Sequence, residues 1–373
     1  MVEWKKLGEV CEFERGRTIT AKDAVDGDIP VIAGGQTPSY YHNEANREGE
    51  SITVAGSGAY AGFVSYWNQP IFVSDAFTVE PKELLSHKYL YHWLKKNQEK
   101  IHATQKGAGV PHVHGKDIAN FLIPIPSLEE QERIVGILDT FTASIDNIKA
   151  QIEQRRKQYE GYLDKFYYSK KEMIDLANKG EIQTKALDEI GTFTRGRRFV
   201  RTDIVSEGVP CIHYGDMYTH YGVKADTTPT YLTEETAKKL RFAQNGDVVI
   251  VGAGENDIDI GVGVAWLGEE DVVIHDACYI FKHGINPIYL SYFMRSNNYH
   301  QQIKMGVVDG KICSISAKEL GRTLIPLPTL SRQQEIVSIL DTFEANITNL
   351  EAQSEQRQKQ YEYYREELLT NLS

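Results

Sequence analysis

Two arginine–glycine segments are the parts of this sequence best suited to contact a polyanion. One reads Arg15-Gly16-Arg17, and the other reads Arg195-Gly196-Arg197-Arg198 with Arg201 close behind. Guanidinium groups donate paired hydrogen bonds to phosphate oxygens or to the O6 and N7 atoms of guanine. The same pattern also occurs in ordinary solvated turns, so the two segments alone leave both interpretations open.

Further basic side chains lie in loops. Two histidines flank Val113, and such a pair could bind a metal ion. The corresponding stretch later in the chain is Ser314-Ile315-Ser316, which favours surface histidines over metal ligands. The predicted nucleic-acid contacts are therefore Arg15, Arg17, Lys106, His112, His114, Lys116, Arg195, Arg197, Arg198, Arg201, Lys304 and Lys311.

The sequence lacks the usual signatures of catalysis. Gly56-Ser57-Gly58 does not have the strand-to-helix context of a dinucleotide-binding motif. Gly115-Lys116-Asp117 and Gly310-Lys311-Ile312 lack the Ser or Thr that follows the lysine of a phosphate loop. Asn286-Pro287-Ile288-Tyr289 resembles the Asn-Pro-Pro-Tyr element of adenine methyltransferases, but a helix start explains it better. We predict no catalytic, cofactor-binding or metal-ligating residue.

Composition limits the class of protein. The 373 residues fit two domains, and 41% hydrophobic with 25% charged residues is typical of a globular chain. The sequence contains no apolar run of membrane-helix length and no signal-peptide stretch, and its four cysteines are single. These features predict a cytoplasmic protein with no membrane contact. The net charge of −11 argues against nucleic-acid binding overall but allows a local basic face.

An internal duplication organises the chain. The stretch Ser127–Phe141 recurs as Thr329–Phe343 at an offset of 202 residues, and Gln131 matches Gln333. The match begins upstream, where Ile123-Pro124-Ile125-Pro126 corresponds to Ile325-Pro326-Leu327-Pro328. Earlier segments match more loosely, and Arg15-Gly16-Arg17 precedes its counterpart by only 180 residues. The order is therefore variable domain, fixed segment, variable domain, fixed segment.

Each fixed segment has the hydrophobic spacing of a long helix. Apolar residues alternate at intervals of four and three, which is the period of a coiled-coil seam. The predicted seam residues are Ile134, Leu138, Phe141, Ile145, Ile148 and Ile152 in the first segment, and Ile336, Leu340, Phe343, Ile347 and Leu350 in the second. The two helices most simply pair with each other, and the alternative is that each packs on its own domain. The duplication also predicts that a severed half pairs with a second copy of itself.

The fold class predicted from these patterns is α+β. The variable domains are mixed but strand-rich, and helices are expected at Ser86–Lys100 and Asn286–Gln302. The predicted divisions are residues 1–127 for the first domain, 128–180 for the first helix with its linker, 181–328 for the second domain and 329–373 for the second helix. Within these divisions, the polar residues 169–183 are expected to form the linker between the halves.

The assembled pattern resembles the specificity (S) subunit of Type I restriction-modification systems over essentially the whole chain. The features that carry the resemblance are the Pro-x-Pro-x-Leu-x-x-Gln-x-x-Ile-Val-x-Ile-Leu-Asp-like elements that begin at Pro124 and Pro326. Gly56–Phe63 followed by Val73-Ser74-Asp75-Ala76-Phe77 supports it. The second copy departs from the first in having Arg332-Gln333-Gln334-Glu335 in place of Glu130-Gln131-Glu132-Arg133, and Gln333 still matches Gln131.

This resemblance implies two target-recognition domains, each of which reads one half of a bipartite double-stranded DNA target. It also implies a pseudo-two-fold repeat in which the two helices form an antiparallel coiled coil that spaces the half-sites. Two methyltransferase subunits, which carry S-adenosylmethionine, would dock on the helices, and restriction-translocase subunits would then join. The chain itself would bind no cofactor and catalyse nothing.

Two other classes of protein remain to be distinguished. A single-chain methyltransferase or nuclease could contain such a recognition half, but it would need a cofactor or metal motif. A structural coiled-coil adaptor would explain the helices but not two divergent domains. Binding to DNA and to a methyltransferase separates the three possibilities.

Overall fold

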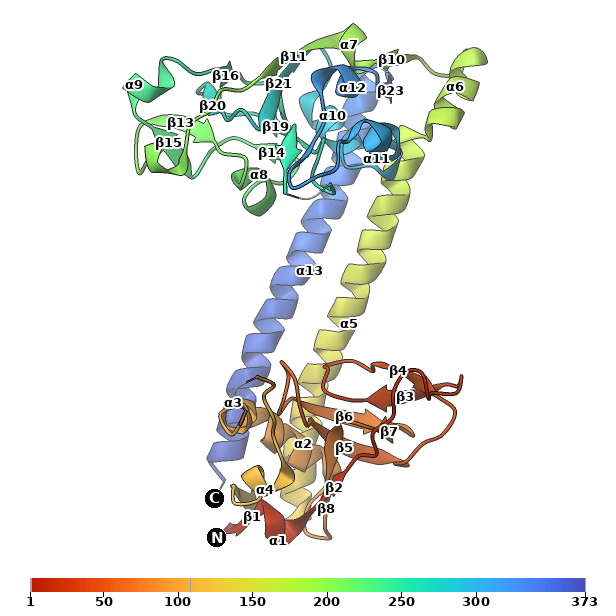
Figure 1. Cartoon of the computed structure of the whole chain (residues 1–373), viewed down its shortest axis with the longest axis vertical. Helices are drawn as coiled ribbons and strands as arrows, with labels where there is room; N and C mark the ends of the chain where they lie inside the picture. Colours follow the sequence, from red (N-terminus) through yellow and green to blue (C-terminus); the bar gives the residue numbers. More distant parts are fainter. Residues whose placement is uncertain (1, 108, 256, 373) are drawn as a thin grey trace. The chain divides into compact units, whose positions relative to one another are not determined.

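The computed structural model describes residues 2–107, 109–255 and 257–372. The chain divides into two compact units, one made of residues 1–150 with 351–373 and the other of residues 151–350 (Figure 1). Each unit contains one strand-rich domain, the beginning of one long helix and the end of the other. The fold class predicted from the sequence is confirmed, because both strand-rich domains and both long helices are present.

The domain of the first unit is built on three sheets. An antiparallel pair joins β1 (Glu3–Lys6) to β9 (Leu122–Ile125), which contains the first proline motif. A four-stranded sheet has the order β2 (Cys11–Arg15), β8 (Ala76–Pro81), β5 (Glu50–Ala55), β6 (Val64–Asn68). A three-stranded sheet has the order β4 (Tyr40–His42), β3 (Ile29–Ile32), β7 (Phe72–Val73). The short helices are α1 (Leu7–Val10), α2 (His87–Lys96), α3 (Gln98–His102) and α4 (Gly115–Ile118).

The described residues of the second domain form four sheets. Its main sheet has the order β11 (Gly191–Arg195), β21 (Cys278–His283), β17 (Val248–Val251), β19 (Gly263–Trp266), β14 (Lys224–Ala225). A second sheet has the order β12 (Ile204–Val205), β15 (Thr230–Leu232), β13 (Val209–Ile212), β20 (Val272–Ile274), β16 (Phe242–Ala243). The two remaining pairs are β10 (Thr184–Ala186) with β23 (Leu324–Pro326) and β18 (Ala253–Gly254) with β22 (Cys313–Ser314).

Helices and single turns connect the strands of the second domain. They are α7 (Leu187–Ile190), η1 (Arg201–Asp203), α8 (Asp216–Thr219), α9 (Glu234–Ala237), α10 (Pro287–Phe293), α11 (Asn297–Ile303), η2 (Lys304–Gly306) and α12 (Ala317–Gly321). The strand order β2-β8-β5-β6 reappears as β11-β21-β17-β19, so the weak sequence repeat is a strong repeat of topology. The second domain adds β14 and enlarges the second sheet, which explains why the sequence offset grows along the chain.

Both helices predicted within the domains are interrupted. The expected helix at Ser86–Lys100 forms α2 and α3, and Asn97 between them bonds its side-chain amide to the Trp93 carbonyl oxygen at 2.9 Å. The expected helix at Asn286–Gln302 forms α10 and α11, and the Ser296 hydroxyl caps the second piece. A side chain that satisfies free backbone groups at these points makes the break stable, and periodicity alone does not reveal it.

The fixed segments form the long helices α5 (Leu128–Tyr167) and α13 (Leu330–Thr370). Rings contact between the helices in both units: Phe141 lies 5.2 Å from Tyr364, and Tyr162 lies 5.0 Å from Phe343. The residue number rises along α5 as it falls along α13, so the helices pair antiparallel. No helix within the described ranges is both long and apolar enough to span a membrane.

The seam residues do not all have the same surroundings. Ile134, Leu138 and Ile145 are buried in the core of the first unit, and Ile336 and Leu340 are buried in that of the second. Phe141 and Phe343 contact the opposite helix, and Ile148 is buried. The half-buried remainder comprises Ile152, Ile347 and Leu350. The start of each helix therefore packs on its own domain, as the sequence-based alternative allowed, while later turns meet the other helix.

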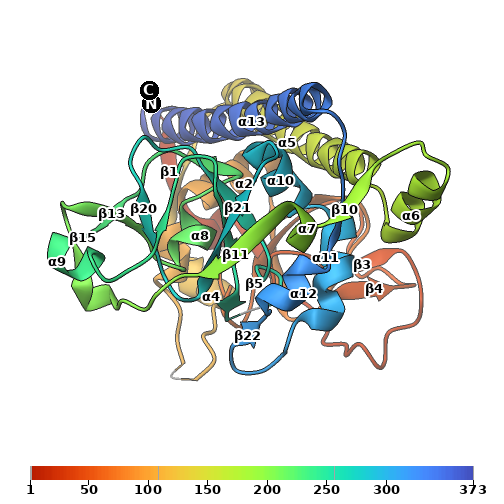
Figure 2. The same cartoon turned by 90° about the horizontal axis from the view of Figure 1, so that it is seen from above.

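Residues 169–183, expected as a polar linker, contain a helix. The chain breaks after α5 at Tyr168, whose φ of 44° is the one positive value among the described non-glycine residues. Ser169 then caps α6 (Lys170–Asn178) by accepting a hydrogen bond from the Glu172 amide at 3.2 Å. Figures 1 and 2 both show α6 beside β10, and Met173 of α6 is fully buried. The linker is therefore an ordered part of the second unit.

Candidate nucleic-acid interface

A cavity of about 350 Å³ in the first domain brings together four of the predicted contact residues. Arg15, His112, His114 and Lys116 all line it, together with Asp75. Arg15 ends strand β2, whereas Lys116 lies in α4. The sequence places these residues about 100 positions apart, and the sheet brings them to one rim.

The two histidines project from one side of an extended segment. Val113 between them is fully buried, and its amide donates to the Gly56 carbonyl oxygen at 3.0 Å. Because side chains alternate along extended backbone, both imidazoles face the same way. Their rings are nearly parallel at 6°, with centroids 6.2 Å apart. The pair therefore presents several ring nitrogens to whatever enters the cavity.

A carboxylate that the sequence-based prediction omitted lies at the same rim. One oxygen of Asp75 accepts a hydrogen bond from the Ser57 hydroxyl, and the Asp75 carbonyl accepts one from the Gly56 amide at 3.0 Å. The rim therefore combines cationic donors from Arg15 and Lys116 with an anionic acceptor. A signal for this residue is present in the sequence, because Asp75-Ala76 recurs as Asp276-Ala277.

Both arginine–glycine segments depend on their glycine for close packing. A Cβ at Gly16 would lie 2.4 Å from the carbonyl oxygen of Ser74, and a Cβ at Gly196 would lie 2.2 Å from that of His275. The backbone of each segment therefore touches the backbone of a neighbouring segment, at Ser74 in the first domain and at His275 in the second. The glycines are therefore required by packing, and the flanking arginines are carried to the surface as a result.

Two other predicted contacts in the first domain have partners within the protein. The Arg17 guanidinium lies over the Phe72 ring at 5.2 Å and lies 3.9 Å from Glu44. Lys106 pairs with Asp117, and this ion pair holds the pKa of the Asp117 carboxyl below its usual range. Neither side chain lines the cavity, although the Lys106 backbone exchanges two hydrogen bonds with that of His112, at 3.0 Å and 2.8 Å.

The four predicted arginines of the second domain are exposed on one short segment. Arg195 donates to the Asp276 carbonyl oxygen and Arg197 to the Lys239 carbonyl oxygen, each at 2.7 Å. The remaining two are Arg198 and Arg201. These backbone contacts orient the segment while leaving it accessible to solvent.

An aromatic cluster lies beside this arginine segment. Phe199 packs edge-on against His275 at 5.1 Å, and His275 lies 4.8 Å from His213. Burial lowers the pKa of both imidazoles, so they are neutral near pH 7. This pair differs in position from His112 and His114, whose counterparts in the second domain are Ser314 and Ser316.

Lys304 and Lys311 lie in the connection between α11 and β22, in which Lys304 begins the single turn η2. Lys304 lines a separate cavity of about 570 Å³ with Asp257, His300 and Asp309. The connection also carries Met305, which is 93% exposed. Neither lysine is among the residues that line the cavity of about 350 Å³.

The structure shows no built site for metal or thiol chemistry in the ranges it describes. It contains no group of three or more His, Cys, Asp or Glu side chains that could bind a metal ion there. All four cysteines are buried. Burial raises the pKa of Cys11 and of Cys278 to about 12, so these thiols are protonated near neutral pH.

Two glutamines at matching positions of the repeat bond each long helix to its domain. Gln131 is fully buried, and its side-chain oxygen accepts from the Ser86 amide at 3.0 Å. Gln333 makes the same bond to the Asn286 amide at 2.9 Å. Each glutamine also donates to a proline carbonyl of its own motif, at 3.1 Å and 2.9 Å. The repeated motif therefore makes the same connection between helix and domain in both units.

Comparisons with known proteins agree with this architecture. The family model described as Type I restriction modification DNA specificity domain matches residues 1–155 and 179–358. A putative type I restriction enzyme specificity subunit from Haemophilus influenzae is 29% identical over 100% of this chain and 96% of its own length. The EcoR124I/EcoR124II specificity subunit from Escherichia coli is 28% identical over 99% of this chain and 94% of its own length.

Solved structures show the same fold. The S subunit of the Type I system from M. genitalium superposes with a TM-score of 0.63 at 17% identity, covering 100% of this chain and 97% of that one. Two copies of one domain topology, joined by repeated helices, are thus found together with a family match over both copies. The chain belongs to the family of Type I restriction-modification DNA specificity subunits.

Proposed function

We propose that each strand-rich domain reads one half of a bipartite DNA target. The observation that carries this proposal is that the two domains share one strand order and a few matching residues, while the residues around these differ. Arg15, Gly16 and Asp75 recur as Arg195, Gly196 and Asp276. The rim residues around them change, from Ser57 to Ala253, His112 to Ser314 and His114 to Ser316. Domains that share this strand order but differ in accessible polar groups are suited to reading different half-sites.

The groups at the first rim match the chemistry of base edges. Arg15 and Lys116 can donate to O6 and N7 of guanine or to phosphate, and a carboxylate such as Asp75 can accept from the amino group of cytosine. Histidine donates or accepts according to its protonation state. The overall charge of −11 implies that much of the phosphate attraction comes from partner subunits.

The long helices set the distance between half-sites in this proposal and dock two methyltransferase subunits. The same glutamine joint occurs twice, so each unit can present an equivalent surface to an identical partner. S-adenosylmethionine would be held by those partners, restriction-translocase subunits would join the assembly, and the chain itself would be non-catalytic. The chain would act in the cytoplasm, where the DNA lies.

The rim exchange Ser57→Ala with His112→Ser and His114→Ser tests the proposal. It gives the first domain the residues that the second has at equivalent positions. The full chain is assembled with its methyltransferase subunit, and the methylated motif is determined by sequencing. We expect the wild-type complex to methylate a bipartite motif and the variant to lose selectivity in one half only.

Controls separate the competing classes of protein. The chain alone with S-adenosylmethionine and Mg²⁺ should neither methylate nor cleave DNA, whereas a single-chain enzyme would. An adaptor without DNA contact would give a complex whose motif does not depend on this chain. If wild type and the variant methylate the same motif, the three substituted residues do not contribute to base recognition.

A further inference from the structure

Each compact unit contains one junction at which the end of a long helix packs on a domain. Junction 1 is the contact of α13, from Glu351 onward, with α2 in the first unit. Junction 2 is the contact of α5, from Gln151 onward, with α10 in the second unit. The junctions are repeat counterparts, so a difference between them bears on which helix end each domain accepts.

At junction 2 a large helix residue faces a smaller domain ring. Tyr167 is fully buried, 5.6 Å from Phe293 and 5.0 Å from Tyr289 between ring centroids. Its hydroxyl donates to the Tyr289 carbonyl oxygen at 2.7 Å. A leucine in this place would leave a cavity and would lose the hydrogen bond to the Tyr289 carbonyl oxygen.

At junction 1 the sizes are reversed. The 202-residue offset matches Tyr167 to Leu369, and the matching of α2 to α10 pairs Phe293 with Trp93. Leu369 and Trp93 are buried in one core, at 1% and 4% exposure. The larger indole is thus combined with the smaller helix residue. A tyrosine in place of Leu369 would overpack this core.

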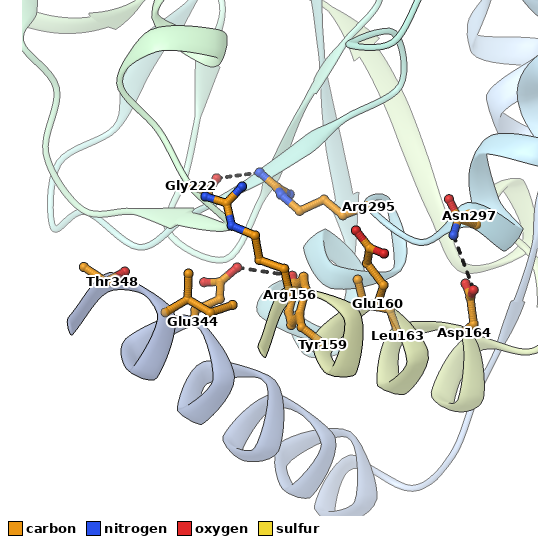
Figure 3. A pocket seen from close by; sticks show the side chains of 11 residues that line it. Arg156, Tyr159, Glu160, Leu163, Asp164, Gly222, Arg295, Asn297, Glu344 and Thr348 are labelled. Carbon is orange, nitrogen blue, oxygen red and sulfur yellow. Dashed lines mark hydrogen bonds between the residues drawn. The ribbon is translucent and has the colours of Figure 1, made fainter. Parts of the chain in front are cut away.

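Charge does not distinguish the two junctions. Leu163 is buried at junction 2 and lines a cavity of about 590 Å³ with Arg295 and Glu344 (Figure 3). Its counterpart on α13 is Arg365. Arg295 donates to the Gly222 carbonyl oxygen at 2.6 Å. Junction 1 has a comparable pair of cations, because Arg365 acts on Lys95, the counterpart of Arg295, and contributes to lowering the pKa of that lysine.

Hydrogen bonds also differ between the junctions. At junction 1 the Tyr361 hydroxyl lies 3.1 Å from Nδ1 of His92. At junction 2 the equivalent Tyr159 hydroxyl donates to Glu344 at 3.2 Å, and the residue of α5 equivalent to Glu344 is Thr142. Asp164 of α5 and its counterpart Glu366 of α13 are both acidic, so this position does not distinguish the two helix ends.

We propose that the junctions form a pairing code in which the first domain accepts the end of α13 and the second accepts the end of α5. The code excludes a second copy of this chain that would dock α5 on the first domain or α13 on the second. Like halves therefore pair poorly, in contrast to what the duplication alone predicts. This inference does not depend on DNA recognition.

The test exchanges the helix residues of the two junctions within the full chain. The variant Tyr167→Leu with Leu369→Tyr makes both junctions mismatched. We expect its melting temperature to fall by at least about 4 °C. Each helix end now fits the domain of its own half, so we also expect dimers in sedimentation that wild type does not form at the same concentration.

A rescue variant keeps the result interpretable if the exchanged chain merely misfolds. Adding Trp93→Phe and Phe293→Trp exchanges the domain residues as well, and we expect the monomer and most of the melting temperature to return. The matched control Lys165→Glu with Glu367→Lys exchanges two exposed counterparts. It should change neither the melting temperature nor the monomeric state in sedimentation. Wild-type melting in the exchanged chain, or no recovery in the rescue variant, would overturn the code.

Discussion

Phe141 stacks on Tyr364 with ring centroids 5.2 Å apart and planes 23° apart. Its counterpart in the repeat is the contact of Phe343 with Tyr162, because both residues are related to the first pair by 202 positions. One contact therefore occurs twice, once in each compact unit, with the helices exchanged. This is the local evidence that the sequence repeat is a pseudo-two-fold repeat of structure.

Substitution of the buried glutamine should loosen the joint between helix and domain. In Gln131→Glu the side chain loses its amide donor, so the carbonyl oxygens of Leu84 and Pro126 lose a partner. We expect a cost of about 2–4 kcal/mol in the free energy of unfolding, measured by denaturant titration. Gln333→Glu should behave alike, whereas Gln154→Glu, on an exposed face of α5, should change little.

A charge in the buried part of the helix seam should be more damaging than one beside it. Ile145 is 5% exposed in the core of the first unit, so Ile145→Asp places a carboxylate among apolar groups. We expect a loss of roughly 3 kcal/mol or more and a lower melting temperature in a thermal scan. The neighbouring exposed variant Ala150→Asp is the control, and equal melting of the two variants would contradict the burial of Ile145.

Removal of the arginines of the second domain should weaken DNA binding. Arg195→Ala, Arg197→Ala and Arg198→Ala together delete three exposed cations from one segment. If they contact phosphates, the slope of log affinity against log salt should become shallower by up to about 3, as measured in gel shifts of the assembled complex. Lys165→Ala serves as a charge control, and an unchanged slope would exclude phosphate contacts by these arginines.

Stability should fall as pH is lowered toward 4 because of His283. Burial lowers the pKa of its imidazole to about 4, from an ordinary value of 6.5. The unfolded chain binds the proton first, so this contribution is complete above pH 6.5 and is lost as pH falls toward 4. In melting curves recorded from pH 7 to 4, His283→Phe should show a smaller decrease than wild type.

The strand-rich domains and long helices followed from the sequence because their signals are local or repeated. The β-branched run Val248–Val251 became the fully buried strand β17, and the four–three spacing gave α5 and α13. The breaks at Asn97 and Ser296 did not follow, because one capping side chain decides each break. The rim carboxylate Asp75 was omitted because its role depends on a hydroxyl 18 residues away in sequence.

The first unit is discontinuous in the chain, and this affects the order in which the protein can be completed during synthesis. Residues 151–350 form the second unit from one uninterrupted stretch, whereas the first unit needs residues 351–373. Domains nearest the N-terminus usually finish folding first on the ribosome. Here the first unit cannot be completed first, because His92 gains its partner Tyr361 only after the whole second unit has been translated.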